Sequence, residues 1–149
     1  MLIPCFLRQG VVYIPTAGMI ERGFYRDIEP VTVVAVSNTE ALRRAFANAV
    51  ALGNPKVPPP LRGAKHPVPI LLKYSGLKSW NTFAREASHW DFEDRNGVFL
   101  ITHYDKAPPG GWTKDEGKDE TFPPGTSTTE VIERMIAILQ AAAAVERSG

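Results

Sequence analysis

The sequence predicts a single α+β domain over residues 1–149, with a mostly antiparallel sheet of about four to six strands and two main helices packed on it. Short runs of alternating apolar and polar residues indicate the strands, and the pair Asn96-Gly97 marks a β-hairpin turn. Helix-capping sequences precede two amphipathic stretches, which begin near residues 37 and 127. Hydrophobic residues make up 44% of the chain, which is enough for one core without a disulfide or a metal.

The sheet is expected to begin with two short strands in residues 2–14, joined by a turn at Gln9 and Gly10. Residues 16–22 are expected to form a turn or a helical piece. The strongest strand signal is the run from Val31 to Val36. Because this run is nearly continuously apolar, it predicts a strand that is covered on both faces.

The first main helix is expected to follow a capping box made by Ser37 and Glu40, and to end before Gly53. The last helix is expected over residues 127–144, with Ser127 as its capping residue. Both stretches carry an apolar stripe at helical spacing, so both helices should pack on the sheet.

Two segments between these elements lack regular periodicity. Residues 54–69 are rich in proline, include His66, and predict an irregular surface crossover. Residues 70–74 form a short strand or a helical turn, and Ser79 caps a short helix. Residues 106–125 read as one long loop, a length at which loops are usually functional or mobile.

The predicted hairpin spans residues 90–104 and turns at Asn96-Gly97, which sets the register of its strands. Phe92 should therefore lie opposite Ile101 on the buried face. The other face is expected to be solvated. It carries His89, Asp91, Glu93, Leu100, Thr102 and Tyr104.

Composition narrows the classes of function. The formal charge is +1, without a basic stripe, so direct binding of nucleic acid is not expected. No apolar run is long enough to span a bilayer and no signal peptide is visible, so the protein is expected in the cytoplasm, away from membranes. The single cysteine, Cys5, excludes an intramolecular disulfide and is expected to be a buried hydrophobic residue.

His89, Asp91 and Glu93 are the best candidates for catalysis or metal binding, because alternate residues of a strand share a face. A small metal-dependent hydrolase could use such a set. An ordinary polar face would have the same pattern, and this interpretation is favoured. His66 and His103 lie elsewhere, so no nucleophile, base and orienting group come together. The sequence therefore predicts no catalytic residues, no metal and no cofactor.

The most informative segment lies within the long loop, where Gly110-Gly111 precedes Trp112. Tryptophan is common at interface hot spots, and charged rims steer partners. The alternative is that Trp112 packs back onto the core while the charges face solvent. The predicted partner-binding residues are Trp112, Lys114, Asp115, Glu116, Asp119 and Glu120.

Residues 70–140 carry a pattern of aromatic residues and loop glycines. It consists of Tyr74-Ser75-Gly76, Ser79-Trp80, Phe83, Ala87, Trp90, Gly110-Gly111-Trp112, Glu130-Val131-Ile132, Met135-Ile136 and Leu139. In this pattern the chain resembles the small immunity proteins of bacterial contact-dependent growth inhibition and related polymorphic toxin systems. The near-neutral charge departs from the acidic character of many nuclease inhibitors.

The resemblance implies a binding protein and not an enzyme. Its partner would be the C-terminal domain of a cognate toxin, often a nuclease, which it neutralises in the cytoplasm of the producing cell. The sequence carries no signal for an oligomeric state.

Overall fold

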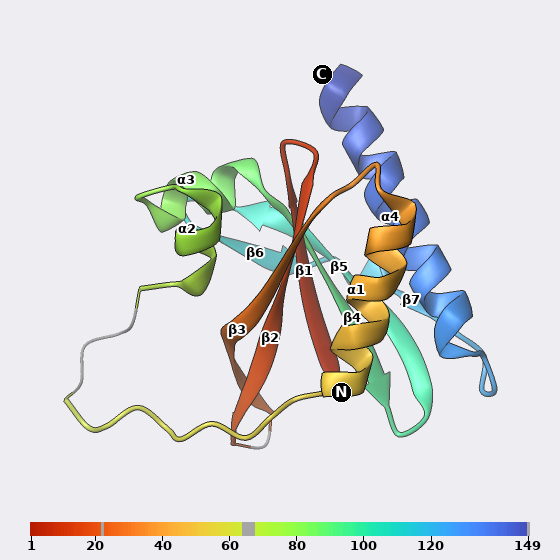
Figure 1. Cartoon of the computed structure of the whole chain (residues 1–149), viewed down its shortest axis with the longest axis horizontal. Coiled ribbons are helices and arrows are strands. Elements are labelled where there is room, and N and C mark those ends of the chain that lie inside the picture. Colours follow the sequence, from red (N-terminus) through yellow and green to blue (C-terminus); the bar gives the residue numbers. More distant parts are fainter. Residues whose placement is uncertain (22, 64–67, 149) are drawn as a thin grey trace.

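The computed structural model describes residues 1–21, 23–63 and 68–148. The strands form one antiparallel sheet of seven strands in the order β3-β2-β1-β4-β5-β6, with β7 also paired to β5 (Figure 1). The α+β prediction is confirmed, but its four to six strands and two helices are too few. The strands are β1 (Leu2–Arg8), β2 (Val11–Glu21), β3 (Phe24–Ala35), β4 (Ser88–Arg95), β5 (Val98–Ala107), β6 (Gly111–Lys114) and β7 (Glu120–Thr121). The helices are α1 (Thr39–Leu52), α2 (Ile70–Ser75), α3 (Trp80–Glu86) and α4 (Thr128–Ser148), with a 3₁₀ turn, η1, at Glu116–Lys118.

The first hairpin turns where the sequence predicts. Gln9 and Gly10 both have positive φ, at 49° and 75°, and Leu7 pairs with Val12 across the turn. Cys5 is fully buried, and this burial raises the pKa of its thiol well above the usual value. β2 continues to Glu21, so the expectation of a turn or helical piece at residues 16–22 is wrong for the residues that the structure describes.

β3 lies at one edge of the sheet and pairs with β2 alone. Val31 packs on one face and Val34 on the other, but Val33 is 44% exposed and no residue of the strand is fully buried. The prediction of a strand covered on both faces is therefore wrong. The apolar run reflects the preference of β-branched residues for extended backbone, a preference that edge strands share with buried ones.

The second hairpin confirms the sequence register. Asn96 and Gly97 have positive φ, at 53° and 85°, and form the turn between β4 and β5. Phe92 pairs with Ile101, and both side chains are fully buried.

The helix α1 begins one residue later than predicted. The side chain of Asn38, and not that of Ser37, accepts a hydrogen bond from the backbone N–H of Ala41. Gly53, with φ at 68°, ends the helix as expected by donating its N–H to the carbonyl of Ala49. Asparagine and serine are equally good capping residues, so local sequence alone does not decide between neighbours.

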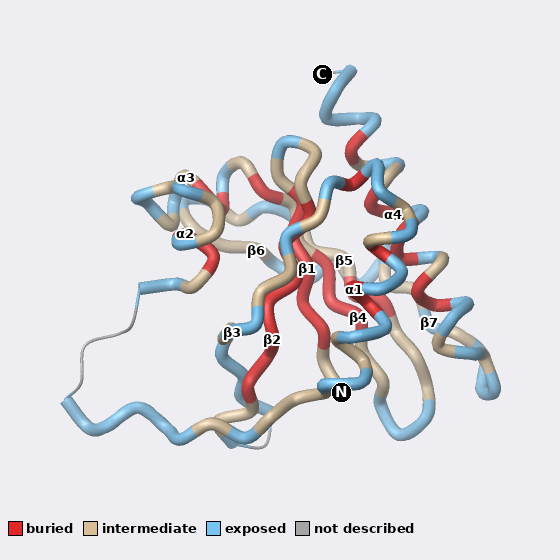
Figure 2. Tube along the Cα trace, in the orientation of Figure 1, coloured by how far each residue is buried: buried red, intermediate tan, exposed pale blue. Residues whose placement is uncertain are grey.

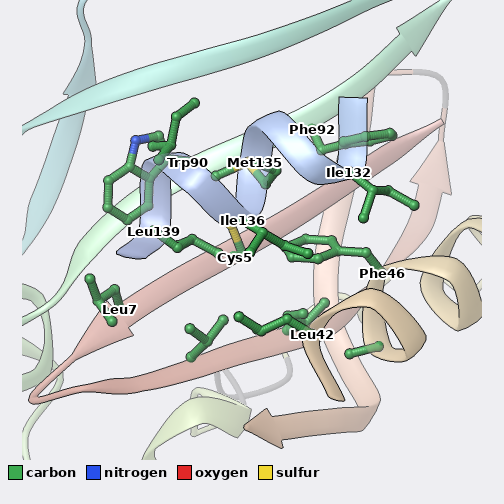
Figure 3. Close-up of a cluster of buried hydrophobic side chains, with 14 of the residues drawn as sticks. Cys5, Leu7, Leu42, Phe46, Trp90, Phe92, Ile132, Met135, Ile136 and Leu139 are labelled. Carbon is green, nitrogen blue, oxygen red and sulfur yellow. The ribbon is translucent and has the colours of Figure 1, made fainter. Parts of the chain in front are cut away.

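The main core lies between the sheet and the pair α1 and α4, which cover the same face (Figures 1 and 3). Ser127 caps α4 by accepting from the N–H of Glu130, as predicted, and the helix continues beyond the predicted end at residue 144. The buried side chains of this core include Cys5, Leu7, Leu42, Phe46, Phe92, Ile101, Val131, Met135, Ile136 and Leu139.

A second core lies on the opposite face of the sheet, under α2 and α3 (Figure 2). Residues 70–75 are helical, and Ser79 caps α3 by accepting from the N–H of Thr82. This second core consists of buried Phe6, Tyr13, Leu71, Leu72, Phe83 and Ala87, with partly buried residues that include Trp80 and Trp112.

The structure describes the proline-rich crossover over residues 54–63 and 68–69. Asn54 anchors its start: its side chain accepts from the N–H of Leu2 and donates to the carbonyls of Leu2 and Ala17. The predicted surface position of His66 lies outside the described residues.

Candidate functional site

The polar row on β4 follows from the alternation of the strand. His89, Asp91 and Glu93 project from the face that carries the second core. The Nε2 atom of His89 lies 3.0 Å from Oδ1 of Asp91. Tyr104, on β5, donates a hydrogen bond of 2.6 Å to Oδ2 of Asp91. Both carboxylate oxygens of Asp91 are therefore engaged within the sheet.

The imidazole of His89 packs among aromatic rings. It lies nearly parallel to the rings of Tyr104 and Phe6, each with a centroid separation of 4.3 Å, and Trp112 meets it at 5.2 Å. The side chain of His89 is only 14% exposed. The expectation of a solvated outer face is therefore wrong at this end of the hairpin, because the second core extends over it.

The electrostatic environment of His89, Asp91 and Tyr104 keeps the hydrogen bond from Tyr104 to Asp91 in place. Burial and the negative charge of Asp91 raise the pKa of Tyr104 well above its usual value, so the phenol remains a hydrogen-bond donor. Glu93 turns away from His89 and pairs with Arg95, with 2.8 Å between Oε2 and Nε. The network therefore links β4 to β5 and does not gather a third acidic ligand.

The hydrolase hypothesis requires His89, Asp91 and Glu93 to converge on one metal ion or one substrate. Within residues 1–21, 23–63 and 68–148, no group of three His, Cys, Asp or Glu side chains is placed to hold a metal ion. The structure brings His89 and Asp91 together but directs Glu93 to Arg95. The three residues therefore do not assemble the set that the hydrolase hypothesis uses.

The segment 106–125 is not one long loop. It contains the end of β5, the strands β6 and β7, and the turn η1. Trp112 pairs with Lys106, and Glu120 pairs with Ile101. Sequence patterns missed these strands because both are very short and carry no run of alternating apolar residues.

Trp112 packs inward, against the second core. Its indole lies 5.4 Å from Phe6 and 5.8 Å from Trp80, measured between ring centroids. The indole N–H donates a hydrogen bond of 3.1 Å to the carbonyl of Ala87. Trp112 therefore fastens β6 to the sheet, as in the alternative that the sequence left open.

The carboxylates that follow Trp112 are largely engaged within the protein. Asp115 pairs with Lys118 at 3.2 Å, and Asp119 accepts from the backbone N–H of His103 at 3.1 Å. Glu120 accepts from Arg134 at 2.6 Å and lies 3.0 Å from Nε2 of His103.

Hydrogen bonding by Arg134 lowers the pKa of Glu120, so this pair stays charged near neutral pH. Lys114 is exposed, as is Glu116, and neither side chain has a hydrogen-bonding or ionic partner among the residues that the structure describes. The predicted partner-binding set therefore divides into four residues with internal contacts and two that face solvent.

Sequence reasoning overlooked an exposed aromatic pair at the start of β3. Phe24 is 65% exposed and Tyr25 is 37% exposed. The available signal was the sequence Gly23-Phe24-Tyr25, where two large aromatic residues follow a glycine with φ at 85°. Together with Val33, they are the large hydrophobic side chains that this edge strand exposes.

Comparisons with known proteins give a fold but no family. No family model matches the chain, and no curated protein matches it. The structure is similar to a protein of unknown function from Neisseria meningitidis, with a TM-score of 0.65 and 16% identity over 98% of this chain and 93% of that chain. It is also similar to a chain of the CdiA-CT/CdiI toxin and immunity complex from Yersinia pseudotuberculosis, with a TM-score of 0.63 and 12% identity over 95% of each chain.

At these identities the comparisons show a shared fold that covers nearly the whole chain. None of the helices in the described ranges combines the length and apolar character needed to cross a bilayer.

Proposed function

We propose that this protein is an immunity protein, which binds a bacterial toxin domain and neutralises it by protein–protein interaction. The observation that carries the proposal is the match of the fold, over 95% of each chain, to a chain of a toxin and immunity complex. The aromatic and glycine pattern of residues 70–140 points to the same class from sequence. The partner would be the C-terminal domain of a cognate toxin, met in the cytoplasm, and no cofactor is required.

The surface chemistry supports a binding role. Phe24, Tyr25 and Val33 expose apolar area on one edge strand. Aromatic residues at the surface supply much of the binding energy in protein interfaces. The polar network of His89, by contrast, is packed within the fold and serves the sheet.

The segment from Trp112 to Glu120 is proposed as part of the partner-binding surface. Lys114 and Glu116 would contact the toxin directly, because both side chains are exposed. The other four residues would contribute by holding the shape of the segment. They are Trp112, Asp115, Asp119 and Glu120.

Growth in culture tests this function. The candidate toxin domain would be expressed from an inducible promoter, with and without this protein. We expect the toxin domain to stop growth alone and growth to resume when the protein is co-expressed. Arrested growth despite folded, abundant protein would overturn the proposal, and an immunity protein from an unrelated system serves as the control.

A further inference from the structure

A groove of about 570 Å³ lies on the face of the sheet that carries the second core. It is formed by the first half of β3, the residues that lead into α2, and the start of α3. Its lining includes Tyr25, Arg26, Asp27, Glu29, Val68 and Trp80.

The walls of the groove are aromatic and aliphatic. The Trp80 ring is fixed in place: it stacks on Phe83 with 5.4 Å between centroids, and its N–H donates to the carbonyl of Gly110 at 2.9 Å. Tyr25 is 37% exposed and Val68 is 77% exposed, so apolar surface is open to a ligand. The electron-rich faces of such rings attract cations.

Asp27 is the unusual polar group in this groove. It is half-buried, and no group among the described residues donates a hydrogen bond to its carboxylate or forms an ion pair with it. Glu29, in the same groove, accepts from Lys73 at 2.9 Å and from the hydroxyl of Tyr74. The remaining charged lining residue is Arg26, which is exposed.

A half-buried carboxylate without a partner is costly, because it has lost water and gained no donor. Burial raises the pKa of Asp27 to about 6, with a further increase from Asp91 and an opposing effect from His89. A cation placed in the groove would remove this penalty, and the apolar walls would exclude water from the pair.

We propose that the groove receives one arginine or lysine side chain of the toxin partner, whose cationic head pairs with Asp27 while its aliphatic stem lies between Tyr25 and Trp80. This inference rests on the proposed function, since it names the chemistry with which the partner is recognised. A basic side chain suits both parts of the groove, because its stem is apolar and its head is charged.

Other occupants fit less well. An acidic side chain would meet the like charges of Asp27 and Glu29. A neutral apolar side chain would bury Asp27 further without supplying a donor. The groove therefore selects a basic side chain by charge as well as by shape.

The first test compares Asp27→Asn with Glu29→Gln in binding to the toxin domain. Asp27→Asn should weaken binding about tenfold or more, because it removes one partner of a desolvated pair. Glu29→Gln, a matched change at the rim of the groove, should alter affinity by less than about threefold. In the free protein, Asp27→Asn should raise the melting temperature at neutral pH, whereas a merely structural carboxylate would lower it. Equal binding by wild type and Asp27→Asn would overturn the proposal.

The second test does not require the toxin. The probe is Nα-acetyl-arginine N-methylamide, with the citrulline analogue as the uncharged control, titrated into protein carrying ¹³C-labelled aspartate. The arginine probe should shift the Asp27 carboxyl resonance and lower the pKa of that group, and the citrulline probe should not. An ordinary pKa near 4 for Asp27 in the free protein would show that the carboxylate already has a partner, and would overturn the proposal.

The two tests separate the two claims. If the wild-type protein binds the arginine probe but not the toxin domain, the proposed function fails while the preference of the groove for a basic side chain stands. If it binds the toxin domain but neither probe nor substitution has an effect, the groove proposal fails while the function stands.

Discussion

The indole N–H of Trp112 donates a hydrogen bond of 3.1 Å to the carbonyl of Ala87, the residue that connects α3 to β4. This contact joins β6, at one edge of the sheet, to a connection in the second core. A residue that resembles an interface hot spot in sequence is thus also a structural anchor. Its substitution should affect the fold before it affects any partner.

Trp112→Ala should therefore lower the free energy of unfolding by about 3 kcal/mol, because it removes a large ring packed against Phe6 and Trp80. Trp112→Phe should cost less, since it keeps a ring and loses mainly the hydrogen bond. Urea unfolding measures both values. A Trp112→Ala protein as stable as wild type would contradict the anchoring role.

The cap of α1 provides a sharp local comparison. Asn38→Ala should lower the free energy of unfolding by about 1 kcal/mol, because it leaves the N–H of Ala41 without its acceptor. Ser37→Ala should change it by less than about 0.5 kcal/mol, since Ser37 makes no capping bond to this helix. Thermal unfolding of the two variants measures both losses of stability. A larger loss for Ser37→Ala than for Asn38→Ala would identify Ser37 as the capping residue.

The turn at Asn96-Gly97 requires positive φ at both residues, and the side chain of Asp94 accepts a hydrogen bond of 2.9 Å from the N–H of Gly97. Gly97 has φ at 85°, and a Cβ added there would meet no atom within 4 Å. Gly97→Ala should then cost about 1 kcal/mol or more through the strained φ. Gly111→Ala is the matched control, because Gly111 also has free space and its φ is not positive. Equal stabilities of the two variants would rule out a conformational role for Gly97.

The stability of the free protein should depend on the ionisation of Asp27. Its pKa is raised to about 6 in the fold, so the contribution of this one carboxyl to stability is greatest below its unfolded pKa near 4 and is lost as the pH rises from there through 6. Asp27→Asn should match wild type near pH 4 and be more stable by about 1 to 2 kcal/mol at pH 7.

Several charged groups influence this titration. The charges of His89 and Asp91, on β4, act on the Asp27 carboxyl, and Arg26 and Glu29 line the same groove. The difference between wild type and Asp27→Asn cancels the contributions that these neighbours make in both proteins. Chemical unfolding at four or five pH values gives the curve, and a constant difference across the range would contradict the raised pKa.

Lys114 and Glu116 offer a test of the proposed interface by charge. Lys114→Gln and Glu116→Gln should change the association rate with the toxin domain in opposite directions. The two removed charges have opposite sign, and both would experience the same electrostatic potential from the partner. Both effects should shrink as salt is raised, and neither variant should lose stability. Stopped-flow mixing measures the rates. Association rates equal to that of wild type at low salt would show that Lys114 and Glu116 are not part of the partner-binding surface.

The sequence predicts features whose cause is local. Asn96-Gly97 needs only its own backbone preference, and the resulting register correctly pairs Phe92 with Ile101. The predicted end of α1 before Gly53 and the predicted cap of α4 at Ser127 are also correct, because both depend on local sequence. The α+β class followed from these local signals.

Features that depend on distant partners escaped prediction. Val31 to Val36 read as a doubly covered strand, but its place at the sheet edge is set by pairing with β2 alone. β6 was missed because backbone pairing with β5 holds it, without a periodic apolar signal of its own. The groove around Asp27 brings β3 next to α2 and α3, a contact between segments that local patterns do not connect.

Binding of the purified protein to its cognate toxin domain tests the central claim most directly. Isothermal titration calorimetry, with an assay of toxin activity on the same samples, should show a saturable complex with a Kd near or below about 10⁻⁹ M and loss of activity at stoichiometric protein. Heats no larger than those of dilution, together with full toxin activity at micromolar concentrations of the folded protein, would contradict it.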